Sequence, residues 1–237
     1  MQELDFRVPQ SLVAENPTTM ILSAKSSRFK KYGRIVESVV VDELLKKAHE
    51  LITLSDEEKT FYIPSIKELE EMEQGKNLSL FFGGMDIEIG SCYGKNERIN
   101  GAEYHKSPEL FIAVTDCLQF LSPYDELDDF AQLNSCKAEV FYFPKGSVAL
   151  IEPNVLHLAP CSVHKNGFIS LIVLPQGTNL PLDAEDLARK SNSDDPELRL
   201  LYKKNKYMLA HQSRTHLIND GVLDGLKGEN RHINPIA

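Results

Sequence analysis

Short hydrophobic runs dominate the middle of the chain. Between residues 78 and 175, eight segments are rich in β-branched and aromatic side chains, and Gly, Pro or Asn stands between most of them. Runs of this length are typical of strands, and no helical period interrupts the series. The region therefore predicts an antiparallel sandwich or barrel. The segments are LSLFF, MDIEIGSCY, GAEYHKS, LFIAVTDCLQFL, AEVFYFP, SVALIEP, LHLAPCSV and FISLIVLP.

Helical patterns flank this region on both sides. Residues 42–54 (DELLKKAHELITL) carry apolar side chains at helical spacing, and residues 65–74 (SIKELEEMEQ) begin with the pattern of a capping box. Before them, residues 32–41 (YGRIVESVVV) have the β-branched run of a strand. Beyond Pro181, the segments 183–190 and 195–211 predict helices.

The expected architecture is mainly β and forms one structural domain with three parts. Residues 1–77 are a mixed α/β extension packed on the barrel, residues 78–180 are the barrel core, and residues 181–237 are a helical extension. The acidic connection at 122–137 is predicted to be an excursion, with a lid as the alternative. A chain of 237 residues can bury a sizeable core without disulfides or a structural metal.

Charge and composition narrow the partners. The formal net charge of −9 argues against a nucleic-acid or anionic-membrane surface, because both need clustered Lys and Arg. No apolar stretch approaches the roughly 20 residues of a membrane span, and MQELDFRVPQ lacks the order of a secretory signal, so a cytoplasmic protein is expected. Cys92, Cys117, Cys136 and Cys161 form no CxxC pair and are predicted to be reduced thiols.

The segment GAEYHKSPELFIAV carries the candidate chemistry. In a strand, residues two apart share a face, so Glu103 and His105 project together, and Glu109 keeps the same parity if the chain stays extended past Pro108. Two carboxylates and an imidazole inside a barrel are costly to bury unless a cation lies between them, and a divalent metal suits these donors. The alternative is a charged strand end with one hydrogen-bonded structural histidine.

A second segment, ALIEPNVLHLAPC, supplies His157 after a Pro-Asn turn. The pattern ExHxxxE, followed about fifty residues later by PNxxH, resembles the two motifs of the cupin superfamily. Glu103 stands where that pattern has its first histidine, and Asn154 stands where it has glycine. Asn tolerates the left-handed backbone, so the second departure is mild. The resemblance implies a cupin-type antiparallel β-barrel that holds a metal through Glu103, His105, Glu109 and His157.

Longer stretches extend the resemblance to about residues 80–230. The segments GSCYGKNERINGAEYHKSPELFIAVTD, YFPKGSVALIEPNVLHLAPC, GFISLIVLPQGTN and NKYMLAH are similar to an uncharacterised bacterial cupin-like family that accompanies sugar-utilisation genes. The opening FKKYGRIVE is also similar to the first strand of ureidoglycolate lyases, which are cupin-like. The resemblance implies a small sugar or sugar acid as substrate and a homodimer that pairs through sheet edges.

Four further residues are candidates for binding the substrate. Tyr93, Arg98 and Asn100 precede the motif strand, where cupin barrels open, and their side chains can hydrogen-bond a polyol or carboxylate. A polar turn is the alternative for these three. Arg98 is the expected cation for an acidic substrate. Lys206, in the predicted late helix, is expected to cover the barrel mouth, with a solvated helix face as the alternative.

The predicted function follows from the metal. A divalent ion, Zn first and Mn, Fe or Ni as alternatives, would act as a Lewis acid on adjacent substrate oxygens. A carboxylate beside it could then move a proton, so Glu103 and Glu109 are catalytic candidates together with Arg98. This chemistry favours an isomerase or epimerase that passes through a metal-stabilised enediolate. A lyase, an iron-dependent oxygenase, a non-enzymatic sugar-binding sensor or accessory protein, and a metal-free barrel are the alternatives.

Overall fold

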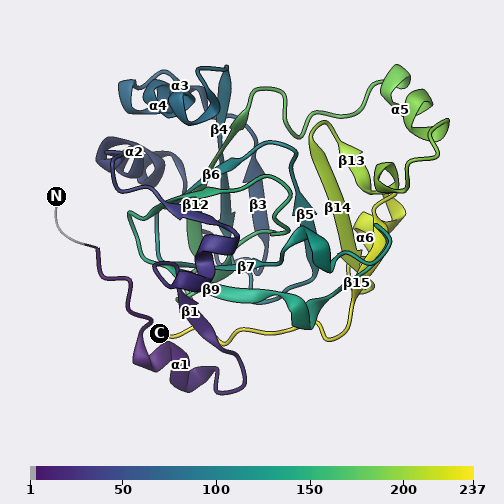
Figure 1. Ribbon diagram of the computed structural model, residues 1–237. Helices are drawn as coiled ribbons and strands as arrows, with labels where there is room; N and C mark the ends of the chain where they lie inside the picture. The colour runs from purple at the N-terminus through teal and green to yellow at the C-terminus, as the bar shows by residue number, and fades with distance from the viewer. Residues whose placement is uncertain (1–3) are drawn as a thin grey trace.

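Two facing sheets form the centre of the computed structural model, which describes residues 4–237 (Figure 1). The larger sheet has the strand order β2-β10-β6-β12-β4-β3, and the smaller has the order β1-β9-β7-β11. All pairs are antiparallel except β1 with β9. The strands are β1 Ile21–Ser23, β2 Gly33–Ile35, β3 Thr60–Ile63, β4 Ile87–Gly94, β6 Glu109–Ala113, β7 Cys117–Leu121, β9 Glu139–Phe143, β10 Val148–Ile151, β11 Cys161–Ser162 and β12 Phe168–Pro175.

The chain passes repeatedly from one of these sheets to the other. Strand β6 lies in the larger sheet, β7 and β9 in the smaller, β10 in the larger, β11 in the smaller and β12 in the larger. As a result, β6 pairs with β10 and β12 rather than with its neighbours in sequence. This alternation is the strand order of a double-stranded β-helix, so the predicted cupin-type antiparallel β-barrel is confirmed.

Alternation along each strand separates the barrel interior from its outer faces. Phe111 on β6 points inward and meets Phe143 of the opposite sheet, with ring centroids 5.2 Å apart. Leu110 and Ile112 point outward into a second apolar cluster. Because both faces of the strand are covered, the run ELFIA is buried throughout.

Helices cover the outer face of the larger sheet. Helix α2 (Asp42–Leu51) forms as predicted and buries Leu44 and Ala48 against that face. The helix predicted over 65–74 is divided into α3 (Lys67–Glu70) and α4 (Glu73–Asn77). The segment LSLFF, predicted as a strand, is a 3-10 helix in which Leu78 and Phe82 are buried while Leu80 between them is 73% exposed. Burial at every fourth position fits a helical turn and not a strand.

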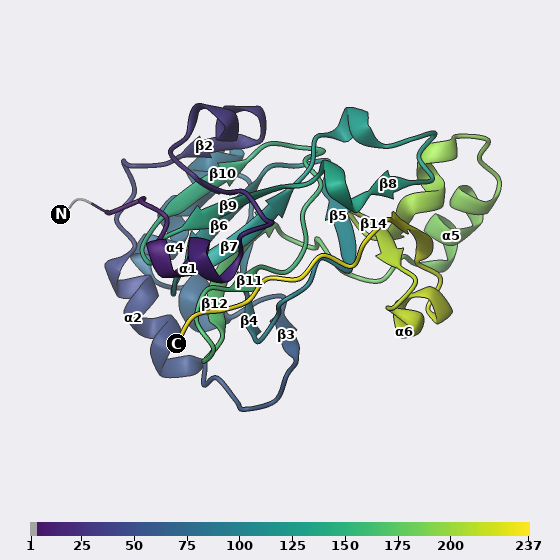
Figure 2. The ribbon, with the colours of Figure 1, turned by 90° about the horizontal axis from the view of Figure 1, so that it is seen from below.

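A third sheet covers the outer face of the smaller barrel sheet, on the side away from α2, α3 and α4 (Figures 1 and 2). Strand β14 is its centre: it pairs with β5 along one edge and with β13 and then β15 along the other. Strand β15 in turn pairs with β8. The strands are β5 Gly101–Tyr104, β8 Leu133–Asn134, β13 Leu201–Lys203, β14 Lys206–His211 and β15 Leu223–Lys227.

This sheet corrects two sequence predictions. Residues 195–211, predicted as a helix, form a short 3-10 helix at Pro196–Leu200 followed by the hairpin β13–β14. The C-terminal part is therefore not mainly helical, although α5 (Ala184–Ser191) forms as predicted and α6 (Thr215–Asn219) follows later. The physical reason is pairing with β5 and β15, which are distant in sequence and override local helix preference.

The N-terminal part contributes strands to the barrel rather than only packing on it. Strands β1, β2 and β3 are edge strands of the two central sheets, and β2 takes up only three residues of the strand predicted over 32–41. The other end of the chain returns to α1 (Gln10–Glu15), because Asn234 donates to the Asn16 side chain at 2.8 Å. Within residues 4–237, none of the helices combines the length and apolar character that a bilayer crossing requires.

Candidate metal centre

The four predicted ligands come together where the barrel meets the third sheet. Glu103 lies on β5, His105 directly follows that strand, Glu109 begins β6, and His157 lies between β10 and β11. Glu103 and His157 form an isolated antiparallel bridge, with N–H···O distances of 2.6 and 2.8 Å in the two directions. The bridge sets the two motifs side by side, so both segments present their donors to one point.

The Pro-Asn turn before His157 has the predicted conformation. Asn154 has φ of 65°, which is the left-handed region that asparagine tolerates. Its backbone N–H donates to the His105 carbonyl at 2.8 Å. The turn therefore connects the second motif directly to the first.

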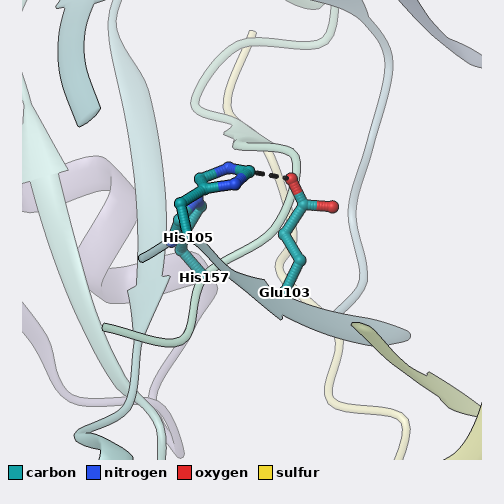
Figure 3. Close-up of side chains that lie close together, drawn as sticks. All are labelled: Glu103, His105 and His157. Atoms are coloured by element: carbon teal, nitrogen blue, oxygen red, sulfur yellow. Dashed lines mark ion pairs between the residues drawn. The ribbon is translucent and has the colours of Figure 1, made fainter. Parts of the chain in front are cut away.

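Figure 3 shows the side chains of Glu103, His105 and His157 close together, and the distances within the four-residue cluster suit a first-row divalent metal. Metal bonds of about 2.0–2.2 Å place neighbouring ligand atoms roughly 2.8–3.6 Å apart. Glu109 Oε2 lies 3.2 Å from His157 Nε2 and 3.6 Å from His105 Nε2. Glu103 Oε1 is farther, at 3.9 Å from His105 Nε2. One ligand atom from each of Glu103, His105 and His157 lies within 4.8 Å of the others.

Backbone carbonyls fix the orientation of both imidazoles. His105 Nδ1 lies 2.6 Å from the carbonyl of Asn205, and His157 Nδ1 lies 2.8 Å from the carbonyl of Val155. A carbonyl only accepts, so each Nδ1 carries the proton and donates it, and each Nε2 presents a lone pair to the cluster whenever the ring is neutral. This arrangement of an oriented second nitrogen is typical of metal-ligating histidines.

Burial leaves polar atoms of the cluster without hydrogen bonds. Glu109 Oε1 is buried and has no hydrogen-bond partner within residues 4–237, and buried His157 Nε2 has the 3.2 Å contact with Glu109 Oε2 but no partner there with hydrogen-bond geometry. Such atoms are costly in a protein interior unless a ligand or ion satisfies them. The donor set and its unsatisfied atoms therefore fit a divalent metal.

Electrostatic coupling separates the two histidines. Burial lowers the pKa of His105, and the neighbouring His157 lowers it further. Burial also disfavours the charged form of His157, but the Glu109 carboxylate outweighs this effect and raises the pKa of His157 to about 9. Burial raises the pKa of Glu103, but Lys206 and the two histidines outweigh it and hold that pKa below its usual range. Glu103 is therefore ionised at neutral pH.

The cluster lines one wall of a cavity of about 280 Å³. Its other walls include β3, β4, β7 and β12 of the barrel and strands of the third sheet. Lys206, on β14, projects into the cavity and its Nζ lies 2.5 Å from Glu103 Oε2. Lys206 was predicted to lie on a helix that covers the barrel mouth; it lies in the cavity wall, and on a strand. The cavity is also lined by Tyr62, Cys92, Gln119, Lys203 and Arg214.

The other predicted substrate residues do not line this cavity. Tyr93 lies on the outer side of β4, where its ring stacks on Phe61 at 5.4 Å. Arg98 is exposed and donates to the Asn230 carbonyl at 3.2 Å. Asn100 accepts from Arg214 at 2.7 Å and so supports a cavity residue without lining the cavity itself. Strand parity explains Tyr93, because the inward-facing neighbour on β4 is Cys92.

Several residues of the site were missed in the sequence. Gln119 is buried in the apolar strand CLQFL, and its unpartnered Oε1 lies among the cavity-lining groups; a polar residue in such a run was the available signal. Tyr62 accepts a hydrogen bond from Asn179 at 3.0 Å at the cavity wall. Arg214 follows β14, which was predicted as a helix, and no local sequence pattern indicates that its side chain lines a cavity. Cys92 is a neutral thiol, because burial raises its pKa.

Solved structures of similar fold share little sequence with this chain. Bacillus subtilis oxalate decarboxylase, in a mutant form, matches at a TM-score of 0.31 and 10% identity over 49% of this chain and 25% of its own. The non-heme alpha-ketoglutarate-dependent epimerase SnoN from nogalamycin biosynthesis matches at a TM-score of 0.38 and 12% identity, over 63% of this chain and 81% of its own. A cupin-like protein of Thermotoga maritima matches at 0.28 and 13%, over 49% and 68%. The fold assignment rests on the strand order given above.

The matched part thus spans about a quarter of the oxalate decarboxylase chain. No curated protein has a matching sequence. A family model described as a domain of unknown function (DUF4867) matches residues 21–231, which include both barrel sheets, the third sheet and all four candidate metal ligands. The chain therefore belongs to the DUF4867 family.

Proposed function

We propose that this chain is a metal-dependent cupin enzyme that acts on a small sugar or sugar acid as an isomerase or epimerase. The observation that carries the proposal is the Glu103–Lys206 pair, 2.5 Å apart, beside two oriented imidazoles and Glu109 in one cavity. Zinc is the first candidate for the ion, with manganese, iron or nickel as alternatives, because imidazole and carboxylate donors suit all four. Bound there, the ion would supply Lewis-acid polarisation of substrate oxygens.

The residues of the chain would then move the proton. For an isomerase, ionised Glu103 can accept a proton from the carbon next to the carbonyl and return it to the former carbonyl carbon, while the hydroxyl proton passes to the carbonyl oxygen. An epimerase would instead return a proton to the opposite face of the same carbon and would need a second donor on that side. Lys206 holds Glu103 in place and can donate a hydrogen bond to a substrate oxygen. The proton taken from one carbon is returned to another, so no oxidant or reductant is consumed. The phenolic hydroxyl of Tyr62 is a further donor for a polyol.

Carbon-bound proton exchange in D2O tests the proposal. Metal-loaded protein is incubated with a panel of pentoses, hexoses, aldonates and uronates, and exchange is followed by NMR. We expect exchange with at least one compound and a decrease of about 100-fold or more in Glu103→Gln. Glu88→Gln is the matched control, because Glu88 is a buried carboxylate on β4 that lies outside the cavity. It accepts a hydrogen bond from the Gly177 backbone N–H.

Two results would favour other functions. Thermal stabilisation by a sugar without any exchange would favour a non-enzymatic sugar-binding protein over an isomerase. Exchange accompanied by loss of water or cleavage of the substrate would favour a lyase. Undiminished exchange in Glu103→Gln would contradict the role given to this carboxylate.

A further inference from the structure

We propose that Arg214 makes the cavity selective for an anionic substrate, by binding one oxyanion group of it, a carboxylate or a phosphate monoester. That the bound anion is a substrate rests on the proposed function. The binding preference itself stands on the cavity alone.

Arg214 is half-buried in the cavity wall and forms no ion pair with any residue between 4 and 237. Its Nη1 donates to Asn100 Oδ1 at 2.7 Å, while its Nε is buried with no hydrogen-bond acceptor. Among residues 4–237 no carboxylate lies within 4.0 Å of the guanidinium, and Glu103 interacts with it only at longer range. A buried N–H donor without an acceptor is costly, and a carboxylate or phosphate oxygen is the acceptor that the planar guanidinium fork matches.

The guanidinium is also held in place before any ligand arrives. Asn100 accepts from Nη1 through its side chain, and its carbonyl accepts from the His211 backbone N–H at 3.0 Å. The Arg214 backbone N–H donates to the His211 carbonyl at 2.8 Å. A donor fixed in this way loses less conformational entropy on binding than a free surface arginine does.

The charge balance of the cavity favours an anion. Lys203, Lys206 and Arg214 line it against two carboxylates, Glu103 and Glu109. Glu103 pairs with Lys206, and Glu109 lies between the imidazoles, so among the described residues neither carboxylate forms an ion pair with Lys203 or Arg214. A divalent ion would add two further positive charges. The cavity is thus locally positive in a chain of net charge −9.

Size limits the ligand further. A cavity of about 280 Å³ is at the small end of the range for ligand sites, so it suits one monosaccharide-sized acid or phosphate and not a polymer. Arg214 lines the same cavity as the four candidate metal ligands, so one small molecule can reach both.

Paired ligands test the proposal directly. Affinities of metal-loaded protein are measured by calorimetry at fixed ionic strength for glycolate and ethylene glycol, galacturonate and its methyl ester, glucuronate and glucose, and ribose 5-phosphate and ribose. We expect at least one anion to bind 10-fold or more tightly than its neutral partner. Arg214→Met should weaken that anion about 10- to 100-fold and leave the neutral partner unchanged. Arg214→Lys keeps the positive charge but loses the planar guanidinium fork, so its affinity for that anion should lie between those of wild type and Arg214→Met.

Arg189→Met is the matched control, because it removes the same charge from a 73% exposed side chain on α5. It should leave the preference intact. A uronate preference identifies a carboxylate ligand, and a preference confined to ribose 5-phosphate identifies a phosphate ester. The proposal is overturned if no anion outbinds its neutral partner, or if folded Arg214→Met and Arg214→Lys both keep the preference. Tight anion binding without proton exchange would contradict the isomerase proposal but not the role of Arg214. Proton exchange on neutral sugars without any anion preference would contradict the role of Arg214 but not the isomerase proposal.

Discussion

Glu103 and Glu109 are both predicted ligands, but different contacts hold them. Glu109 Oε2 lies between the two imidazole Nε2 atoms, at 3.2 and 3.6 Å, and its other oxygen has no hydrogen-bond partner among residues 4–237. Glu103 directs one oxygen to Lys206 and is farther from His105, at 3.9 Å. These distances favour Glu109 as the stronger metal ligand and Glu103 as the residue that moves the proton.

Metal content therefore should differ between the two amide variants. Glu109→Gln removes the anionic donor between the imidazoles, so we expect less than half of the wild-type metal per chain after dialysis against metal-free buffer. Glu103→Gln should retain most of the metal. Elemental analysis measures both, with melting temperature as the check of folding and Glu88→Gln as the buried control outside the cavity. Equal loss in Glu103→Gln and Glu109→Gln would contradict this division of roles.

The turn between β13 and β14 is the element that positions His105. Asn205, at φ of 55°, offers its carbonyl to His105 Nδ1, and its side chain accepts from the Lys106 backbone and donates to Ser107 Oγ at 2.8 Å each. A hairpin of the third sheet thus fixes the imidazole and the two residues that follow it.

Two substitutions at Asn205 separate backbone from side-chain effects. Asn205→Ala loses the side-chain bonds and must adopt a left-handed backbone, so we expect a loss of about 1–3 kcal/mol in unfolding free energy. Metal affinity should fall about 10- to 100-fold, the usual effect of disturbing a ligand's outer hydrogen bond. Asn205→Gly tolerates the backbone and should be affected less on both counts. Denaturant titration and competition with a metal indicator provide the two measurements, and a stronger effect in Asn205→Gly would contradict the strain argument.

A cluster of tyrosines around Lys106 and Glu197 lies on the other side of β5. The Lys106 ammonium lies 5.1–5.4 Å from the ring centroids of Tyr104, Tyr124 and Tyr207, and 2.5 Å from Glu197 Oε1. Glu197 also accepts from the Tyr104 and Tyr124 hydroxyls. The cluster joins the residue after His105 to the segment that leads into β13.

Acid should weaken this cluster. Burial raises the pKa of Glu197, but the hydrogen bonds from Lys106, Tyr124 and Tyr104 outweigh it and hold the pKa below its usual range. A lowered carboxyl pKa stabilises the fold above the unfolded value of about 4.3, and the contribution is lost as pH falls through the folded value. Glu197→Gln should therefore cost about 1–3 kcal/mol at pH 7, with the difference from wild type shrinking below about pH 4. Urea unfolding at several pH values measures it; Glu185→Gln, on exposed α5, should show no such difference.

The sequence predicted the elements that local pattern determines and missed those set by distant pairing. Strand alternation placed Glu103 and His105 on one face, and the Pro-Asn turn brought in His157, because these features are local. Strand β14 was predicted as a helix, since its partners β5 and β15 lie far away in the sequence. Arg214 was missed for the same reason, because nothing near it in the chain marks the cavity that it faces. Arg98 was predicted as the substrate-binding cation because it precedes the motif strand, where cupin barrels open, but its side chain is exposed outside the cavity.

The candidate metal centre connects all three sheets. Glu103 belongs to the third sheet, Glu109 to the larger barrel sheet, and His157 to the connection from that sheet to the smaller one. The C-terminal segment, which follows β15 of the third sheet, also contacts loops next to barrel strands. The Ile233 N–H donates to the Glu97 carbonyl at 2.8 Å, and the Ile236 N–H donates to the Val163 carbonyl at 2.9 Å. The barrel and the third sheet should therefore unfold together.

Metal removal tests this coupling. A ligand present at 100 times its dissociation constant stabilises the native state by about 2.7 kcal/mol, which corresponds to roughly 5–10 °C in melting temperature for a chain of this size. We expect a single calorimetric transition that rises by this amount with metal and returns with EDTA. In the His105→Ala, His157→Ala double variant, neither metal nor EDTA should move the transition. Two transitions of which only one responds to metal would mean that the third sheet unfolds independently, because a centre shared by all three sheets must shift them together.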